Sequence, residues 1–300
     1  MRAQFLPPDE SLASLPAADL QKALNIRTYS GYKAPLGQFK GRNFLFDALL
    51  AKMVTNFPFE DQCSADYYFD LFTCLKHHVG EFNRVVEVGV YMGGASVIIG
   101  GCAQALNFDV DLVDPNAQFL QFAYERIRRS FPEAARRVRL FQGTLPAYVQ
   151  QVLISEPDAR AVVQHDGPHA FETVVKDLAS LYYASNQIQG IAVQDTNLRG
   201  LPKSMSFVDL AICAVFGYDV NHLKIGQVVQ ANDSLRVNPN QYQGNYVMPG
   251  MHEGMYIPMA ANEFFYPHPL MALEDFVYDI PLLAYSRPGL DEAPQSANVA

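Results

Sequence analysis

The chain has 300 residues, of which 49% are hydrophobic and 18% are charged, and its formal net charge at pH 7 is −9. The hydrophobic content is sufficient for a substantial buried core, which excludes general disorder. The net negative charge, without a stripe of Lys and Arg, argues against nucleic acid as a partner, and the arginine cluster at residues 126–139 is interpreted as a solvated rim near a helix end.

No segment of the sequence indicates secretion or a membrane span. The N-terminal stretch lacks the apolar core of a signal peptide, and no window approaches the roughly 18 uninterrupted apolar residues that cross a bilayer. The four cysteines have no CxxC spacing, so we expect free thiols rather than a zinc knuckle or a disulfide framework. We therefore expect a cytoplasmic protein without a membrane partner.

Residues 1–80 are predicted to form a mainly helical cap, with the best helices at 47–56 and 65–79. From about residue 84, short β-rich runs alternate with helical patterns, as in βαβ units. We therefore predict an α/β fold at 81–237, with a doubly wound, mostly parallel, Rossmann-like sheet and helices on both faces. The expected strands are 84–88, 110–113, 138–142, 161–164 and 190–194. The expected helices are 95–106, 117–130, 170–185 and 205–215. Two edge-like strands are expected to follow at 220–224 and 227–237.

Two further features complete the expected organisation. In the helix at 170–185, apolar residues recur at helical spacing and leave Asp177 on the wetter face. Residues 238–300 are expected to form a loop-rich extension whose tail, after residue 288, is disordered. The part at 238–269 is rich in Met, Tyr and Phe, and it is interpreted as a functional loop, an oligomer interface or a cover for a sheet edge.

The stretch at 85–100 joins a buried strand, a glycine-containing turn and a helix, which is where α/β folds bind nucleotide-like ligands. The residues of interest in this turn are Glu87, Gly89, Tyr91, Gly93 and Gly94. Their spacing fits neither the dinucleotide fingerprint nor a P-loop. The carboxylate of Glu87 favours a ligand with an ammonium or sulfonium group. Alternatively, Glu87 pairs with a local arginine such as Arg84 in a tight structural turn.

Polar residues also follow the next two expected strands. Asp114 ends the second strand, where a carboxylate can hydrogen-bond the vicinal hydroxyls of a ribose. Asp114 can instead cap the following helix, and the two roles can coexist. Gly143 and Thr144 follow the third strand, at the place where this fold often approaches an adenine ring.

Two aspartates follow the fourth and fifth strands. Asp166 and Asp195 are therefore expected at the same edge of the sheet, where converging carboxylates invite a divalent cation such as Mg²⁺. The oxygen shell of this cation would be completed by Gln194, Asn197 or water.

Together, the segments EVGVYMGGAS, VDP, HDGPHAFETVVKDL and QDTNLRG resemble the class I methyltransferases that use S-adenosylmethionine (SAM), and in particular the cephalosporin hydroxylase, rhamnosyl O-methyltransferase and macrocin-type O-methyltransferase group. The resemblance covers about residues 80–235. One of its motifs is an Asp-Gly-x-His pattern with a later Asp, which is matched by Asp166, Gly167, His169 and Asp177.

The resemblance implies roles for the motif residues. Contacts to SAM would come from Glu87, Gly89 and Asp114, metal ligands from Asp166 and Asp195, and a general base or substrate-orienting group from His169. His169 can instead pack or cap at the start of its helix. Gln194 and Pro168 depart from the pattern of the group, which usually has acidic residues at these positions.

The expected activity is transfer of a methyl group from SAM to the hydroxyl of a small molecule, of sugar or phenol type, with assistance from Mg²⁺. Acceptor choice would fall to the first 60 residues and to 240–267, with Tyr256, Phe264 and Phe265, and with His268 just beyond. The alternative is a catalytically degenerate SAM-binding domain with an interaction or regulatory role. A nicotinamide oxidoreductase is disfavoured by the missing second glycine, and a metal-dependent oxygenase by the lack of an assignable iron triad. A homo-oligomer is compatible with the sequence.

Overall fold

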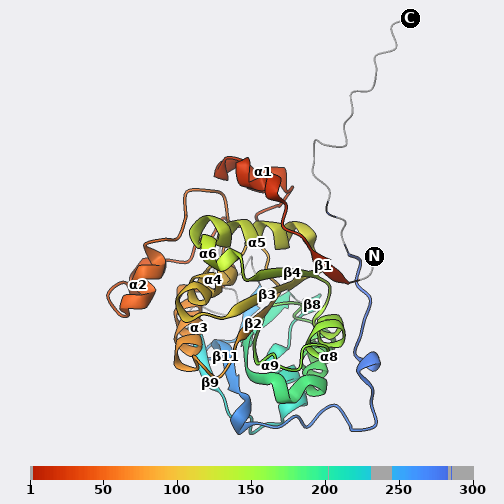
Figure 1. Cartoon of the computed structure of the whole chain (residues 1–300). Helices are drawn as coiled ribbons and strands as arrows, with labels where there is room; N and C mark the ends of the chain where they lie inside the picture. The colour runs from red at the N-terminus through yellow and green to blue at the C-terminus, as the bar shows by residue number, and fades with distance from the viewer. Residues whose placement is uncertain (1–2, 202, 231–244, 283–284, 286–300) are drawn as a thin grey trace, which may run out of the picture.

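The computed structural model describes residues 3–201, 203–230, 245–282 and 285, and at its centre lies an eight-stranded sheet (Figure 1). The strand order is β1-β4-β3-β2-β5-β6-β11-β9. The five strands from β4 to β6 are parallel, whereas β1 and β11 run antiparallel to their neighbours. The strands of this sheet are β1 (Gln4–Leu6), β2 (Arg84–Val88), β3 (Asp109–Asp114), β4 (Val138–Gln142), β5 (Ala161–His165), β6 (Ile188–Gln194), β9 (Leu223–Val228) and β11 (His252–Pro258).

The order in which successive strands are added to the sheet reverses between β2 and β5, although the two strands run parallel. From β2 the chain moves outward through β3 to β4, and then it returns to β5 on the other side of β2. Such a switch point leaves a crevice beyond the carboxyl ends of the strands, where ligands of α/β proteins bind. A small second sheet in the order β10-β7-β8 lies after β6, with β7 (Leu198–Leu201), β8 (Ser204–Met205) and β10 (Tyr246–Val247).

Helices cover both faces of the large sheet because its strands are apolar on both sides. Val85 of β2 packs into a core with α3, α4 and α5, and its neighbour Val86 packs into a second core with α8 and α9 (Figure 1). This alternation along a strand is expected where both faces are buried. The helices are α1 (Leu20–Ala23), α2 (Phe44–Leu50), α3 (Ala65–His77), α4 (Gly94–Leu106), α5 (Ala117–Ser130), α6 (Pro132–Ala135), α7 (Leu145–Tyr148), α8 (Phe171–Ser180) and α9 (Val208–Phe216). Among the described residues, no helix combines the length and apolar character needed to cross a membrane.

The predicted α/β fold with a doubly wound, mostly parallel sheet is confirmed, and each of the five expected parallel strands is present. The expected helix at 170–185 corresponds to α8, which ends at Ser180 and is followed by a 3-10 helix at Leu181–Gln187. The expected helix at 205–215 begins only at Val208. These differences concern element boundaries, which local sequence patterns determine least well.

Two expectations about strands were wrong. In addition, the first 80 residues, expected to be mainly helical, contain one short strand, because Gln4–Leu6 adds an edge strand to β4. The two edge-like strands expected at 220–224 and 227–237 are replaced by the single strand β9, and the later part of that range lies outside the described residues. The expected loop at 238–269 contains β11, which lies inside the sheet between β6 and β9. The residues after 288, expected to be disordered, also lie outside the described residues.

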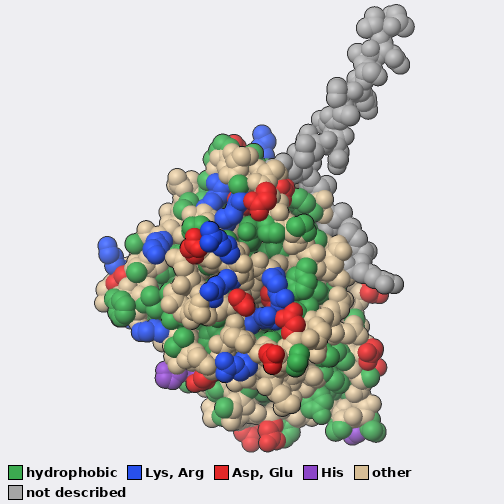
Figure 2. All heavy atoms as spheres, in the orientation of Figure 1, with side chains coloured by type: hydrophobic (Ala, Val, Ile, Leu, Met, Phe, Trp, Pro, Cys, Tyr) green, Lys and Arg blue, Asp and Glu red, His purple; other side chains and the backbone are tan. Residues whose placement is uncertain are grey.

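The arginine cluster at 126–139 is extensively paired with carboxylates. Figure 2 shows Lys and Arg side chains beside Asp and Glu side chains over this face of the molecule. Arg128 and Arg129 both pair with Glu125 of the same helix. Arg126 does not belong to a solvated rim, because its side chain is 2% exposed, donates to Asp61 at 3.1 Å and lies over the ring of Phe59. That part of the expectation was therefore wrong.

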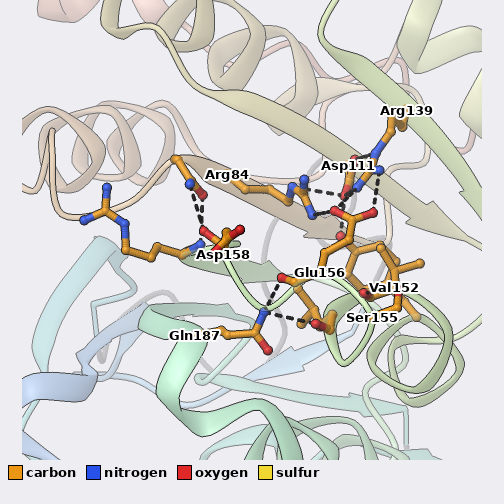
Figure 3. Close-up of polar contacts among 12 residues, drawn as sticks. Arg84, Asp111, Arg139, Val152, Ser155, Glu156, Asp158 and Gln187 are labelled. Atoms are coloured by element: carbon orange, nitrogen blue, oxygen red, sulfur yellow. Dashed lines mark hydrogen bonds and ion pairs between the residues drawn. The ribbon is translucent and has the colours of Figure 1, made fainter.

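The buried carboxylate of Asp111 joins three parallel strands near their amino ends (Figure 3). Asp111 of β3 is fully buried and accepts two hydrogen bonds from Arg139 of β4, at 2.7 and 2.6 Å. Arg84 of β2 lies 3.5 Å away from the same carboxylate, and the hydroxyl of Tyr148 also donates to it. Both arginines also pair with Glu156. This cluster compensates the cost of burying the charge of Asp111.

Removing the carboxylate should therefore destabilise the fold. Asp111→Ala leaves the buried hydroxyl of Tyr148 without its acceptor and removes the buried partner of two guanidinium groups, which keep Glu156, and we expect the free energy of unfolding to fall by about 3 kcal/mol. The matched control is Glu133→Ala, which breaks an exposed pair with Arg136 and should change stability by less than about 0.5 kcal/mol. Urea denaturation of both variants measures this difference, and equal losses would contradict it.

Candidate active site

Two adjacent cavities open at the carboxyl edge of the parallel strands. The larger has a volume of about 600 Å³ and the smaller about 250 Å³. Their shared walls are Gly89, Tyr91, Phe119, Asp166 and Pro168. The larger cavity is also lined by Glu87, Gly94, His169 and Asp195, and the smaller by Asp114, Gly143 and Thr144. Most of the residues singled out in the sequence therefore meet at one edge of the sheet.

The turn between β2 and α4 needs its glycines for close approach. Gly89 has φ +80°, and a Cβ atom there would lie 2.1 Å from the carbonyl oxygen of Asp166. Gly93 has φ +68° and packs on Ala123 of α5, so its contribution is to helix packing rather than to a cavity wall. Tyr91 also has a positive φ, of 42°, which places its ring between the two cavities. The turn is thus held tightly against the end of β5.

Glu87 carries a buried carboxylate that faces the larger cavity. The residue is 1% exposed, and its Oε2 atom has no hydrogen-bond partner among the described residues. Burial raises the pKa of Glu87 well above its usual range, although the hydroxyl of Ser96 opposes this shift, and the nearby carboxylates of Asp166 and Asp114 raise the pKa further. Arg84 instead pairs with Glu156, so the alternative in which Glu87 pairs with Arg84 is wrong. A buried carboxylate with an open oxygen is suited to a cationic ligand.

Asp114 holds the end of β3 and also lines the smaller cavity. Its Oδ2 atom accepts from the backbone N–H of Val90 at 3.0 Å, and its Oδ1 atom accepts from that of Asn116 at 2.7 Å. Burial raises its pKa to about 6. The side chain that caps α5 belongs to Asn116, so Asp114 is not the cap. Thr144, on the opposite wall, caps α7 by accepting from the N–H of Ala147.

Asp166, His169 and Asp195 form a cluster at the mouth of the larger cavity. One ligand atom from each lies within 4.8 Å of the others. The Nε2 atom of His169 is 2.9 Å from an Asp195 oxygen and 3.7 Å from an Asp166 oxygen. Asp195 has φ +63°, a backbone conformation that side-chain-bearing residues adopt mainly at turns and functional sites. The connections that follow β5 and β6 thus converge on one point with atoms that can bind a cation.

The charges in this cluster need compensation. Burial raises the pKa of Asp166, and the carboxylate of Asp195 raises it further. Burial lowers the pKa of His169, but Asp195 and Asp166 outweigh this effect and bring it to about 10. Either the proton on His169 or a divalent cation can therefore offset the two aspartates. The thiol of Cys63 adds a weak hydrogen bond to Asp166 at 3.4 Å.

Gln194 and Asn197 line neither cavity. The amide nitrogen of Gln194 donates to Glu253 at 3.3 Å, whereas its Oε1 atom has no hydrogen-bond partner among the described residues. Asn197 is fully buried. Glu253, which sequence reasoning missed, also accepts from the N–H of Ser64 at 2.8 Å. In the sequence, Glu253 could have been noticed as a single acidic residue in a mostly apolar run, but the segment was expected to be a loop.

Other residues lie elsewhere than expected. Asp177 is fully buried rather than on a wetter face, and its carboxylate lies 2.9 Å from His165. The first 60 residues do contribute to the larger cavity, through Tyr29 and Glu60. Four residues expected to influence acceptor choice line neither cavity: Tyr256, Phe264, Phe265 and His268. Within the described part of 238–269, Asn245 lines the larger cavity.

No protein-family model and no curated protein matches the chain. Among solved structures, the cofactor-bound Rv0187 from MTB is similar at 14% identity and a TM-score of 0.43, over 82% of this chain and 99% of that chain. Precorrin-6y C5,15-methyltransferase from Geobacter metallireducens GS-15 is similar at 15% identity and a TM-score of 0.38, over 69% and 93% of the two chains. The N-terminal domain of EvdMO1, solved with SAH and D-fucose, gives 13% and 0.36, over 81% of each chain. Methyltransferases are thus among the structures to which this chain is similar, although at these scores the likeness by itself identifies no activity.

The crowding at Gly89 leads to a stability prediction. Gly89→Ala should lower the free energy of unfolding by about 3 kcal/mol, because the new methyl group would collide with the backbone at Asp166 as well as strain a positive φ. Gly31→Ala is the matched control, since Gly31 also has a positive φ but has no atom within 4 Å of an added Cβ. It should cost about 1 kcal/mol. Thermal and urea unfolding would contradict the packing argument if both variants lost the same amount.

Proposed function

We propose that this protein is a SAM-dependent methyltransferase that acts on a hydroxyl group of a small molecule, of sugar or phenol type. The proposal is carried by the buried carboxylate of Glu87, whose Oε2 atom has no hydrogen-bond partner among the described residues. Glu87 lines the larger cavity, and Asp114 lines the adjacent smaller cavity. SAM has a methionine end with an ammonium group and a nucleoside end with a vicinal diol. Glu87 suits the first by charge, and Asp114 suits the second by its two acceptor oxygens.

The two cavities accommodate the two ends of such a ligand. The nucleoside base would lie in the smaller cavity against Gly143 and Thr144, and the sulfur would lie near Gly89 and Asp166, where the cavities meet. Gly94, at the start of α4, lies in the wall of the larger cavity, and its missing side chain makes room for the hydroxyl of Tyr68, which lines the same cavity. This arrangement of the lining residues supports SAM as the ligand.

A divalent cation is the second part of the proposal. Asp166, His169 and Asp195 would hold it, with two carboxylate oxygens and one imidazole nitrogen. An oxygen-rich set with one nitrogen admits Mg²⁺ and also Mn²⁺. Bound there, the cation would lower the pKa of an acceptor hydroxyl and neutralise the two aspartates.

The protein's own groups position the acceptor. SAM supplies an electrophilic methyl group when it is bound. The larger cavity extends from Asp166 and Asp195 past Tyr29 and Glu60, so it can hold an acceptor with its hydroxyl beside the aspartates. Without a cation, His169 has a pKa of about 10 and carries a proton at neutral pH, so we assign the role of proton acceptor to the aspartates rather than to His169. A cation bound to the imidazole nitrogen would displace that proton.

The alternative is a SAM-binding domain without catalysis. It is favoured by Gln194, which has a neutral amide where the related group usually has a carboxylate, and which lines neither cavity. The two functions differ in one measurement. Incubation with SAM, Mn²⁺ and a panel of sugar and phenol acceptors yields S-adenosylhomocysteine (SAH) from a methyltransferase and none from the degenerate domain.

Binding of SAH should be linked to loss of a proton from Glu87. Because the pKa of Glu87 is raised in the empty site, a bound ammonium group must lower it, and affinity should rise with pH by up to about tenfold per unit over the range in which Glu87 titrates. Calorimetry in buffers of different ionisation enthalpy measures the released proton. Glu87→Gln should bind SAH more weakly at pH 8 and show a flatter pH dependence. A wild-type affinity that is flat between pH 5 and 8 would contradict this assignment.

The cation site can be tested by binding alone. Mn²⁺ titration followed by electron paramagnetic resonance should show one site in the wild type and an affinity at least about tenfold lower in Asp195→Asn and His169→Gln. The control is His77→Gln, on the exposed end of α3. Equal Mn²⁺ affinity in all four proteins would exclude the cluster as the metal site.

A further inference from the structure

The end of the described chain runs along the outside of α8 and reaches the cofactor edge of the sheet. We call residues 268–282 the C-terminal strap. In Figure 1 this segment passes from the lower edge of the molecule alongside α8 toward β1. It contains one turn of 3-10 helix, at Leu273–Asp275, and otherwise no helix or strand. Its position must therefore be set by side-chain contacts.

The first half of the C-terminal strap is anchored on the second core. Phe276 is 1% exposed and packs against the rings of Tyr183 and Tyr266. The hydroxyl of Tyr183 donates to the carbonyl oxygen of Met271 at 2.8 Å. Burial of an aromatic ring together with a hydrogen bond to the backbone fixes this part firmly on the helical layer.

The second half is attached to the end of β5 through a chain of hydrogen bonds. The hydroxyl of Tyr278 donates to one oxygen of Asp177 at 2.8 Å, and the other oxygen of Asp177 lies 2.9 Å from Nε2 of His165. His165 is the last residue of β5 and directly precedes Asp166. Asp177 and His165 are both almost fully buried, so Tyr278 is joined to a rigid part of the site.

The same part of the C-terminal strap lines the smaller cavity. Tyr278 and Ile280 lie in its wall together with Asp114, Thr144 and Pro168, which come from three different βα connections. Apart from the C-terminal strap, the lining comes from these three connections, from the connection between β2 and α4, and from the helices that follow. No other described residue after 168, apart from Asp177, contributes to the lining.

We propose that the C-terminal strap is a wall of the nucleoside site, with Ile280 in apolar contact with the base and Tyr278 holding the wall shut through Asp177. This inference rests on the proposed function, since it concerns how SAM is held. A base enclosed on this side dissociates only when the bond between Tyr278 and Asp177 opens, so the C-terminal strap sets the dissociation rate of the product SAH.

The inference is tested with two ligands. SAH carries both ends of the cofactor, whereas 5′-methylthioadenosine has the nucleoside but lacks the ammonium and carboxylate groups. Tyr278→Phe and Ile280→Ala should each bind both ligands roughly fivefold more weakly, because each loses one hydrogen bond or one apolar contact of the wall. Glu87→Gln should weaken SAH without affecting 5′-methylthioadenosine. Tyr218→Phe is the control for Tyr278→Phe, since Tyr218 is 90% exposed and should bind like the wild type.

The outcomes separate the two proposals. Weaker binding of both ligands to the two strap variants, with a faster release of SAH and unchanged thermal melting of the free proteins, supports the wall. Wild-type affinity of both strap variants for both ligands, with the wild type binding SAH normally, overturns the wall and leaves the proposed function intact. A wild type that binds neither ligand refutes the proposed function and the wall with it.

Discussion

Electrostatic repulsion at one edge of the sheet is the constraint on which the site depends. Four carboxylates lie at or just beyond the ends of parallel strands: Glu87, Asp114, Asp166 and Asp195. All four are largely buried, and burial raises the pKa of the first three. Such a concentration of negative charge is costly unless positive charge is near. Arg126 lies behind this edge, and His169 lies within it. The remaining imbalance favours cationic ligands over anionic ones.

The N-terminal cap complements this edge in a specific way. Glu60 is 1% exposed, and one of its oxygens accepts from three consecutive backbone N–H groups, those of Tyr29, Ser30 and Gly31. The carboxylate of Glu60 therefore holds a loop in place and is not assigned to a ligand. That loop brings Tyr29 to within 6.3 Å of Tyr91, measured between ring centroids, and so places aromatic surface over the larger cavity. The cap thus forms part of the wall of the larger cavity.

Local sequence patterns predicted the parallel strands and the residues at their ends, because a strand-turn-helix unit is specified over a few neighbouring residues. They failed where long-range contacts decide. Asp177 follows a helical pattern that leaves it outside, yet His165 and Tyr278 draw it into the interior. Gln194 lies at the end of the predicted strand β6, as expected. The orientation of its side chain, however, involves a hydrogen bond to Glu253, which comes more than fifty residues later in the sequence. No pattern within either segment could have revealed that pairing.

The place of β11 in the sheet has a consequence for biosynthesis. β9 contacts the sheet only through β11, which follows it in the sequence and lies between it and β6. A ribosome must therefore release residue 258 before either strand can dock, and until then the edge of β6 is exposed. The smaller cavity is completed later still, because Tyr278 and Ile280 in its wall follow β11 in the sequence. Until both segments have emerged, the nascent chain has an unpaired β6 edge next to Asp195 and a smaller cavity without its last wall.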